Sequence, residues 1–282
     1  MTGPVRVERD GDVAVVVIDN PPVNAGSIEV RRGLLAAVRE IDADPSIVGA
    51  VIIGAGTTFI AGSDIREFGG PIEDPQLPAV IAAIETSPKV FVAAIHGAAL
   101  GGGFELALGC DARVAARKAV VGLPEVSLGI IPGAGGTQRL PRLVGLSAAI
   151  ELICGATRVP APDAQARSMV DAVCEEDALR TTAVALARQR AGQKRRLRDE
   201  PVPVESSDLV DRVAAKRLQS GRHRPHVHAA IDAVRWSATL PPDEGLTRER
   251  ATFQALRATT EAAALRYLFF AERRASKVPG LS

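Results

Sequence analysis

The chain has 282 residues, with 34 Lys and Arg against 33 Asp and Glu, so its formal net charge is +1. Hydrophobic residues make up 46% and charged residues 24%, which is enough apolar content to bury a core and excludes a disordered chain. The balanced charge and the 3% of aromatic residues argue against nucleic-acid and membrane-surface partners, so any anion must be bound by local groups.

The compartment is predicted from the cysteines and from the absence of targeting signals. Cys110, Cys154 and Cys174 are far apart, which indicates neither a disulfide framework nor a zinc knuckle. The chain starts without an apolar signal core, and no run of about 18 apolar residues predicts a membrane span. We therefore expect a cytoplasmic protein of one large or two smaller domains.

The first part of the chain alternates buried strands with helices. Hydrophobic patterns predict strands at 13–18, 48–53, 90–95, 113–116, 119–121 and 170–173, and helices at 28–41, 75–85, 104–108, 147–154, 162–168 and 177–193, with another helix starting near residue 135. Ser27 is the expected N-cap of the first helix. This order predicts an α/β fold with largely parallel strands.

The composition changes over residues 194–208, where a basic run is followed by prolines, and we interpret this segment as a boundary. The basic run is interpreted as a solvated helix end rather than a nucleic-acid patch. Helices are predicted beyond it at 208–220 and 227–237, with one long helix over 242–276. Apolar residues recur along that last helix at Phe253, Leu256, Ala264, Tyr267 and Phe270.

Three segments carry residues suited to chemistry. Gly101–Gly103 run into a helix, where free N–H groups favour an anion and Glu105 lies one turn inside; close strand–helix packing is an equal alternative. Glu125 stands among apolar neighbours, which would raise its pKa towards that of a general acid, unless it is simply a solvated edge residue. Gly62 and Ser63 allow an N–H to point into a cavity, or Asp64 merely caps a short helix.

Together these segments resemble the enoyl-CoA hydratase/isomerase (crotonase) superfamily, from about residue 13 to 173. The motifs are NPPVNA (20–25), FIAGSDIREF (59–68), HGAALGGGFELALGCD (96–111) and LPEVSLGIIPGAGGTQRLPRLVG (123–145). The resemblance implies an α/β crotonase fold of repeated ββα spiral units with an all-helical C-terminal region. It divides the chain into a catalytic core over 1–195 and a helical region over 196–282.

The resemblance also implies the chemistry. The backbone N–H groups of Ser63 and Gly102 correspond to the family's oxyanion hole for an acyl-CoA thioester, and Glu105 and Glu125 to its two hydratase glutamates. The implied reaction is addition of water to trans-2-enoyl-CoA, giving 3-hydroxyacyl-CoA in fatty-acid β-oxidation. Glu105 would be the base and Glu125 the acid. Acyl-CoA is then the substrate, and neither a cofactor nor a metal is expected.

Further residues are implied to bind the substrate or its coenzyme part. They are Val23, Asn24, Ala25, Ala61, Gly62, Asp64, Ile65, Arg66, Gly101, Gly103, Pro132 and Gly133. Arg66 matches a position that is usually basic in the family and would meet a CoA phosphate; a solvated helix charge is the alternative. Phe104 is bulkier than the usual residue and is expected to shape the acyl pocket.

Within the superfamily, the motifs and residues 264–280 look like the hydratase half of multifunctional β-oxidation enzymes. No G-x-G-x-x-G follows a strand, so no dinucleotide-binding domain is expected. A 3-enoyl-CoA to 2-enoyl-CoA isomerase and a non-catalytic acyl-CoA-binding subunit remain as alternatives. A homotrimer or homohexamer is expected if the chain assembles like single-domain relatives, and a monomer if its last helix folds back on the core.

The histidines are weaker candidates. His223, His226 and His228 lie close together, but neither cysteine nor carboxylate joins them, so a zinc site is not predicted. His96 precedes the glycine-rich segment and is expected to be a packed or capping residue.

Overall fold

A computed structural model describes residues 3–71 and 73–275. Its main sheet has the strand order β1-β2-β3-β4-β6-β9, and all of its neighbouring strands are parallel except β1 and β2. The strands are β1 (Val5–Asp10), β2 (Val13–Ile18), β3 (Gly49–Gly54), β4 (Val90–Ile95), β6 (Ala112–Ala116) and β9 (Ala172–Cys174). The predicted α/β fold with largely parallel strands is confirmed.

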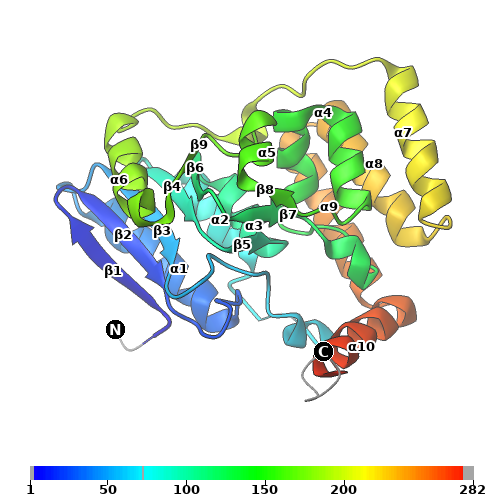
Figure 1. The fold of residues 1–282 in the computed structure, drawn as a ribbon, viewed down its shortest axis with the longest axis horizontal. Helices are drawn as coiled ribbons and strands as arrows, with labels where there is room; N and C mark the ends of the chain where they lie inside the picture. Colours follow the sequence, from blue (N-terminus) through cyan, green and yellow to red (C-terminus); the bar gives the residue numbers. More distant parts are fainter. Residues whose placement is uncertain (1–2, 72, 276–282) are drawn as a thin grey trace.

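Helices cover this sheet because its central strands are apolar on both faces. Every residue of β2 and β4 is buried, as expected where strands are enclosed on both sides. Helix α1 packs on β1 and β2, while α6 packs on β3, β4 and β6. The helices and short 3-10 turns of this part are α1 (Ile28–Ala43), η1 (Ile65–Gly69), α2 (Leu77–Thr86), α5 (Ala161–Ala166), η3 (Glu176–Ala178) and α6 (Leu179–Gln189). Figure 1 shows α1 and α6 lying against the strands of this sheet.

A small second sheet leads into the glycine-rich segment. It has the order β5-β7-β8, with β5 (Ala98–Leu100), β7 (Val120–Gly122) and β8 (Val159–Pro160). Helix α3 (Gly102–Gly109) starts directly after β5, and the turn η2 (Glu125–Leu128) follows β7. Because β5 and β7 are parallel neighbours, their ends bring Gly102 and Glu125 to the same edge of the sheet.

The rest of the chain is helical. Helix α4 (Gly136–Cys154) is kinked at Gly145, and helices α7 and α8 pack against it. After η4 (Leu197–Asp199), the helices are α7 (Ser207–Ser220), α8 (Pro225–Thr239), α9 (Pro242–Arg257) and α10 (Thr260–Ala275). No helix in the part of the chain that the structure describes is long and apolar enough to cross a membrane. The predicted division at residue 195 stays a prediction.

The single long helix predicted over 242–276 is wrong. The chain forms α9 and α10 instead, and residue 276 lies outside the described residues. Thr259 causes the break: its hydroxyl donates to the Leu256 carbonyl at 2.7 Å and accepts from the Ala262 N–H at 3.2 Å. A threonine side chain bonded in this way ends one helix and caps the next.

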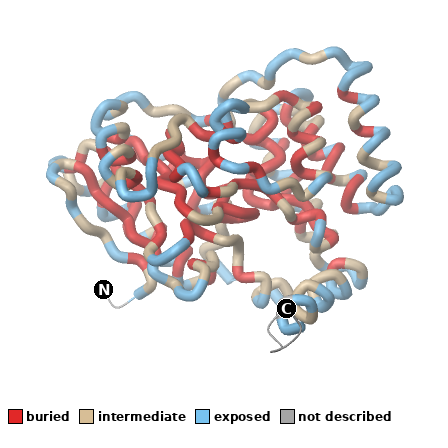
Figure 2. Tube along the Cα trace, in the orientation of Figure 1, coloured by how far each residue is buried: buried red, intermediate tan, exposed pale blue. Residues whose placement is uncertain are grey.

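The apolar stripe predicted for that helix is divided by the break. Phe253 on α9 is buried, whereas the Tyr267 residue on α10 is 69% exposed. Ala264 is also exposed, and Leu256 and Phe270 are partly buried. Figure 2 shows the contrast between the buried centre of the molecule and the largely uncovered α10 near the C-terminal end.

The prediction that the basic run after α6 is a solvated helix end is wrong. Lys194 donates to the fully buried Asp111 carboxylate at 2.8 Å. Arg195 pairs with Asp171 at 3.3 Å and with Glu200 at 2.6 Å. Asp111 lies 83 residues before Lys194 in the sequence. The prediction failed because the basic side chains find partners that only the fold brings near.

Candidate active site

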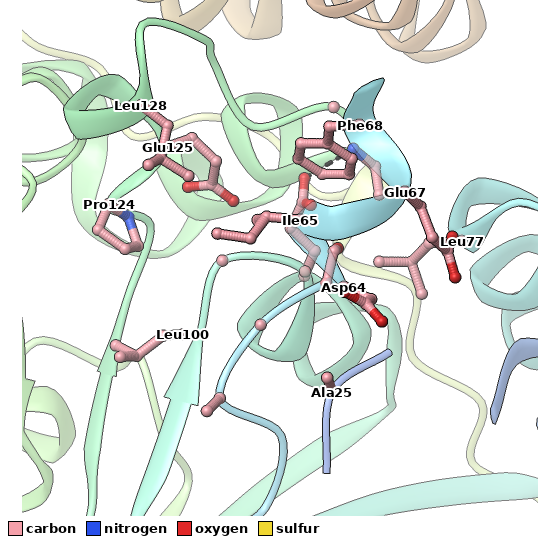
Figure 3. A pocket seen from close by; sticks show the side chains of 18 of the residues that line it. Ala25, Asp64, Ile65, Glu67, Phe68, Leu77, Leu100, Pro124, Glu125 and Leu128 are labelled. Atoms are coloured by element: carbon pink, nitrogen blue, oxygen red, sulfur yellow. Dashed lines mark hydrogen bonds between the residues drawn. The ribbon is translucent and has the colours of Figure 1, made fainter. Parts of the chain in front are cut away.

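One cavity of about 530 Å³ collects residues from all three of the predicted chemical segments. This volume is typical of small-molecule sites. Its wall includes Ser63, Gly102, Glu105 and Glu125, together with side chains from α9 and α10. In Figure 3 the Glu125 carboxylate points across this space towards the side of the η1 turn, where Ile65 and Phe68 lie.

The glycine-rich turn needs its glycines for two reasons. Gly101 has φ 53° and ψ −128°, a conformation that is closed to other residues. A side-chain carbon on Gly103 would lie 2.2 Å from the Ile60 carbonyl oxygen, so the loop before η1 packs directly on the start of α3. The turn therefore serves close packing and also frees the backbone of residue 102 to face the cavity.

Ser63 and Gly102 come from different segments and pack against each other at the cavity wall. A side-chain carbon on Gly102 would be 3.5 Å from the Ser63 nitrogen and 2.3 Å from the Ser63 Oγ. The Ser63 segment is held by the Gly26 N–H, which donates to the Gly62 carbonyl at 2.9 Å. Neither N–H donates to another group within residues 3–71 and 73–275. Ser63 and Gly102 therefore bring two unpartnered backbone donors to the lining of one cavity.

Glu105 lies in the first turn of α3 and is 3% exposed. One of its oxygens, Oε1, accepts from the Ala134 N–H at 2.7 Å and from the Gly136 N–H at 2.9 Å. Burial raises the pKa of Glu105, while these two N–H groups oppose the rise. The carboxylate is thus fixed through one oxygen by the N-terminal turn of α4.

Glu125 begins the turn η2 and has a different environment. Its Oε2 is buried and has no hydrogen-bond partner among the described residues. Burial, followed by the charge of Glu105, raises the pKa of Glu125 well above its ordinary value of 4.5. The site therefore favours a neutral Glu125 beside a Glu105 that is held by donors. Two carboxyl groups with different environments divide the roles of acid and base.

A third buried carboxylate was missed by the sequence analysis. Glu249 on α9 is 1% exposed and accepts from the Gly135 N–H at 2.5 Å and the Thr137 N–H at 2.8 Å. Burial, and then Glu105, raises the pKa of Glu249 to about 8. The spacing of Gly245, Glu249 and Phe253 on one helix face was the available signal, since an acidic residue stood on the buried face.

The residues predicted to bind substrate or coenzyme fall into two groups. Most of them line the cavity: Val23, Ala25, Ala61, Gly62, Asp64, Ile65, Arg66, Gly101 and Gly133. Asn24, Gly103 and Pro132 are not among the lining residues. Asn24 instead has a structural role, because its amide donates to the Ala55 carbonyl at 2.9 Å and to the Thr58 carbonyl at 2.8 Å.

Arg66 and Asp64 are bound to each other. The Arg66 guanidinium pairs with the Asp64 carboxylate at 2.6 Å, and the Asp64 side chain also accepts from the Arg66 N–H at 3.0 Å. The hydrogen bond from the Arg66 side chain lowers the pKa of Asp64. Asp64 therefore caps η1, while the Arg66 side chain, 76% exposed, stands at the cavity rim.

Several cavity residues were not predicted. They are Arg31, Phe68, Gln76, Leu77, Arg158, Arg250, Phe253, Phe269 and Phe270, among others. Arg250 donates to the Gly133 carbonyl at 3.1 Å and lies 4.8 Å from the centre of the Phe253 ring. These aromatic and cationic side chains on α9 and α10 had no motif to mark them, because only the folding of the C-terminal helices over the site gives them a common neighbour.

Other predictions about single residues are resolved by the structure. Phe104 is fully buried in the core and does not line the cavity, so the prediction that it shapes the acyl pocket is wrong. His96 is buried, with its Nε2 3.1 Å from the Gly56 carbonyl, as expected of a packed residue. His226 is buried whereas His223 and His228 are exposed, and the described residues contain no cluster suited to a metal ion.

The parallel sheet, the glycine-rich turn before α3 and the paired glutamates define an α/β protein of the crotonase fold. A family model described as enoyl-CoA hydratase/isomerase matches residues 8–198. The chain belongs to this family.

Similar proteins are found among both sequences and solved structures. The chain is 42% identical over 269 residues to the peroxisomal bifunctional enzyme of Danio rerio, covering 94% of the chain and 37% of that protein. It is 37% identical over 294 residues to the fatty acid oxidation complex subunit alpha of Shewanella amazonensis, covering 96% and 41%. It resembles the crystal structure of the Bacillus anthracis enoyl-CoA hydratase with a TM-score of 0.63 and 28% identity, covering 95% and 96%.

The chain therefore spans about two fifths of the length of these two relatives. It spans nearly all of the solved hydratase. The match to the family model ends at residue 198, so Glu249, Arg250 and the α10 phenylalanines lie outside the matched segment.

Proposed function

We propose that this chain is an enoyl-CoA hydratase that adds water to trans-2-enoyl-CoA and forms 3-hydroxyacyl-CoA. The observation that carries the proposal is the pair of buried glutamates at one cavity, Glu105 and Glu125, beside the free N–H groups of Ser63 and Gly102. Membership of the family and the names of the relatives support an acyl-CoA substrate.

The reaction develops negative charge on the thioester oxygen when water attacks the β carbon. The two N–H donors stabilise that charge, and losing one such donor typically costs about 2.7–4 kcal/mol. Glu105, ionised and held through Oε1, orients the water and takes its proton. Glu125, kept neutral by burial, gives its proton to the α carbon. One water is consumed, and the two carboxyl groups exchange protonation states.

The test is the turnover of crotonyl-CoA by the purified chain and by Glu105→Gln and Glu125→Gln. Each substitution should lower kcat by at least about 100-fold, the usual contribution of a positioned acid or base. Glu40→Gln, at an exposed position on α1, is the matched control and should behave as wild type. Near-normal turnover by both active-site variants would refute the proposal.

The two alternatives are separated in the same assay. The same glutamates would also suit proton transfer between the two carbons of a 3-enoyl-CoA, so turnover of 3-enoyl-CoA without hydration of 2-enoyl-CoA would make the chain an isomerase. Tight binding of acyl-CoA without turnover of either substrate would make it a binding subunit.

The cytoplasmic location and the oligomeric state stay predictions. The Danio rerio relative is peroxisomal by name. A monomer and a trimer or hexamer differ at least threefold in mass, so light scattering on the purified chain separates them.

A further inference from the structure

The N-terminal turn of α4 is held by two carboxylates that take alternate N–H groups. Glu105 accepts from Ala134 and Gly136. Glu249 accepts from Gly135 and Thr137. The Thr137 hydroxyl also donates to Glu249, and Gln138 donates to that hydroxyl at 2.8 Å, so the hydroxyl hydrogen is directed at the carboxylate. Every N–H from residue 134 to 137 is therefore used by one of the two glutamates.

One of the two glutamates precedes this turn in the sequence and the other follows it. Glu105 belongs to α3, inside the segment that matches the family model, whereas Glu249 belongs to α9, beyond its end at residue 198. Helix α9 is seated tightly here: a side-chain carbon on Gly245 would lie 2.4 Å from the Gln138 Oε1, and one on Gly133 would lie 2.4 Å from the Phe253 ring. Neither glycine leaves room for a side chain, so α9 packs directly against this part of the chain.

Packing alone does not account for a buried carboxylate at this position. Glu249 is 1% exposed and interacts with two further glutamates, Glu105 and Glu125, and with the Arg250 guanidinium. Burying a charge is costly unless donors compensate it. The three hydrogen bonds to Glu249 offset part of that cost, and all of them come from the same turn that fixes Glu105.

We propose that Glu249 is a positioning residue for Glu105, acting through the turn 134–137 that both carboxylates share. The proposal rests on the catalytic role of Glu105 given under Proposed function. Among the described residues, the hydrogen bonds to the Glu105 Oε1 come from the Ala134 and Gly136 N–H groups, at 2.7 and 2.9 Å. A turn released by loss of Glu249 would carry those donors with it. Misplacement of a catalytic group by about 1 Å can cost about 100-fold in rate.

The first test is Glu249→Gln, measured for kcat and KM with crotonyl-CoA. The amide would set an N–H donor against either the Gly135 or the Thr137 N–H, so one half of the clamp is lost. We expect kcat to fall about 10- to 100-fold with KM within about threefold of wild type. The control is Glu244→Gln on the same helix, an exposed partner of Arg248, which should leave both constants unchanged.

The second test separates positioning from general structural damage. If Glu249 acts through Glu105, then adding Glu249→Gln to Glu105→Gln should lower kcat by less than about twofold further. Additive losses in the double variant would overturn the proposal, as would a wild-type kcat in Glu249→Gln alone. If Glu249→Gln does not fold, Thr137→Val decides the matter, since it removes one donor to the carboxylate and keeps the shape. A selective loss of kcat supports the proposal and an unchanged kcat overturns it.

A third measurement does not depend on any reaction. Amide hydrogen exchange in the Glu249→Gln variant should be faster than in wild type at Ala134 and Gly136, the two amides bonded to Glu105. Unchanged exchange at these amides would overturn the proposal even if the chain hydrates no enoyl-CoA. Absence of hydration with faster exchange would overturn the proposed function alone.

Discussion

The oxyanion hole can be tested by adding one methyl group. In Gly102→Ala the new side-chain carbon would lie 2.3 Å from the Ser63 Oγ and 3.0 Å from a Leu77 methyl carbon. Real side-chain carbons do not approach other atoms within 3.0 Å, so the Ser63 side chain must move. Ser63 also carries the other proposed oxyanion-hole donor, its backbone N–H.

The expected loss follows from displacement of the Ser63 N–H together with its side chain. Removing one oxyanion-hole donor costs about 10²–10³ in kcat, and we expect Gly102→Ala to lose activity in this range. Ser63→Ala removes the oxygen that the new methyl would strike and keeps the backbone N–H. It should therefore be nearly as active as wild type, and the double variant should recover part of the activity lost in Gly102→Ala.

The assay is the hydration of crotonyl-CoA at saturating substrate, with circular dichroism to confirm folding. The recovery in the double variant is the decisive comparison, since it depends on the steric cause. A Gly102→Ala enzyme with kcat within threefold of wild type would refute this steric reasoning, because the Ser63 hydroxyl would then move without its N–H. A Ser63→Ala enzyme as impaired as Gly102→Ala would show that the serine side chain, and not its N–H, is needed.

Further predictions concern stability. Because the pKa of Glu125 is raised in the folded state from 4.5, wild-type stability is lost as pH rises from that value to the folded pKa. Glu125→Gln should therefore gain stability relative to wild type over this range, by at most about 1.4 kcal/mol per pH unit. Urea unfolding at several pH values measures this gain, and a pH-independent difference between the two proteins would refute it. Glu85→Ala leaves the Arg139 guanidinium buried without its carboxylate and should lower the free energy of unfolding by about 3–5 kcal/mol. The control Glu175→Ala, at an exposed ion pair, should change it by less than about 1 kcal/mol. Equal losses would contradict the burial argument. Asn24→Ala removes the bonds to Ala55 and Thr58 and should cost about 1–3 kcal/mol, measured by the same unfolding; an unchanged midpoint would show that the loop holds without them.

Much of the fold was open to prediction because its signals are local. Continuous apolar runs such as Val13–Ile18 and Val90–Ile95 form strands of the same bounds in the structure. Ser27 caps α1 through its hydroxyl, as its residue type predicts. Strand β1 was missed because its alternating charged residues lie at the sheet edge, where one face is open to solvent. The break at Thr259 was missed because a helical hydrophobic period continues on both sides of it.

The sequence by itself determined the paired glutamates, the glycine-rich turn and the family resemblance, because these are carried by residue types at fixed short spacings. It did not determine the environments of those residues. The α4 turn holds Glu105, while the Glu125 Oε2 has no partner in the described part of the chain. Both facts depend on segments that meet only in the folded chain. The same holds for Glu249, which lies 144 positions after Glu105 and meets it only at residues 134–137. Hydrogen-bond partners and burial set protonation and position, and both are properties of the tertiary structure.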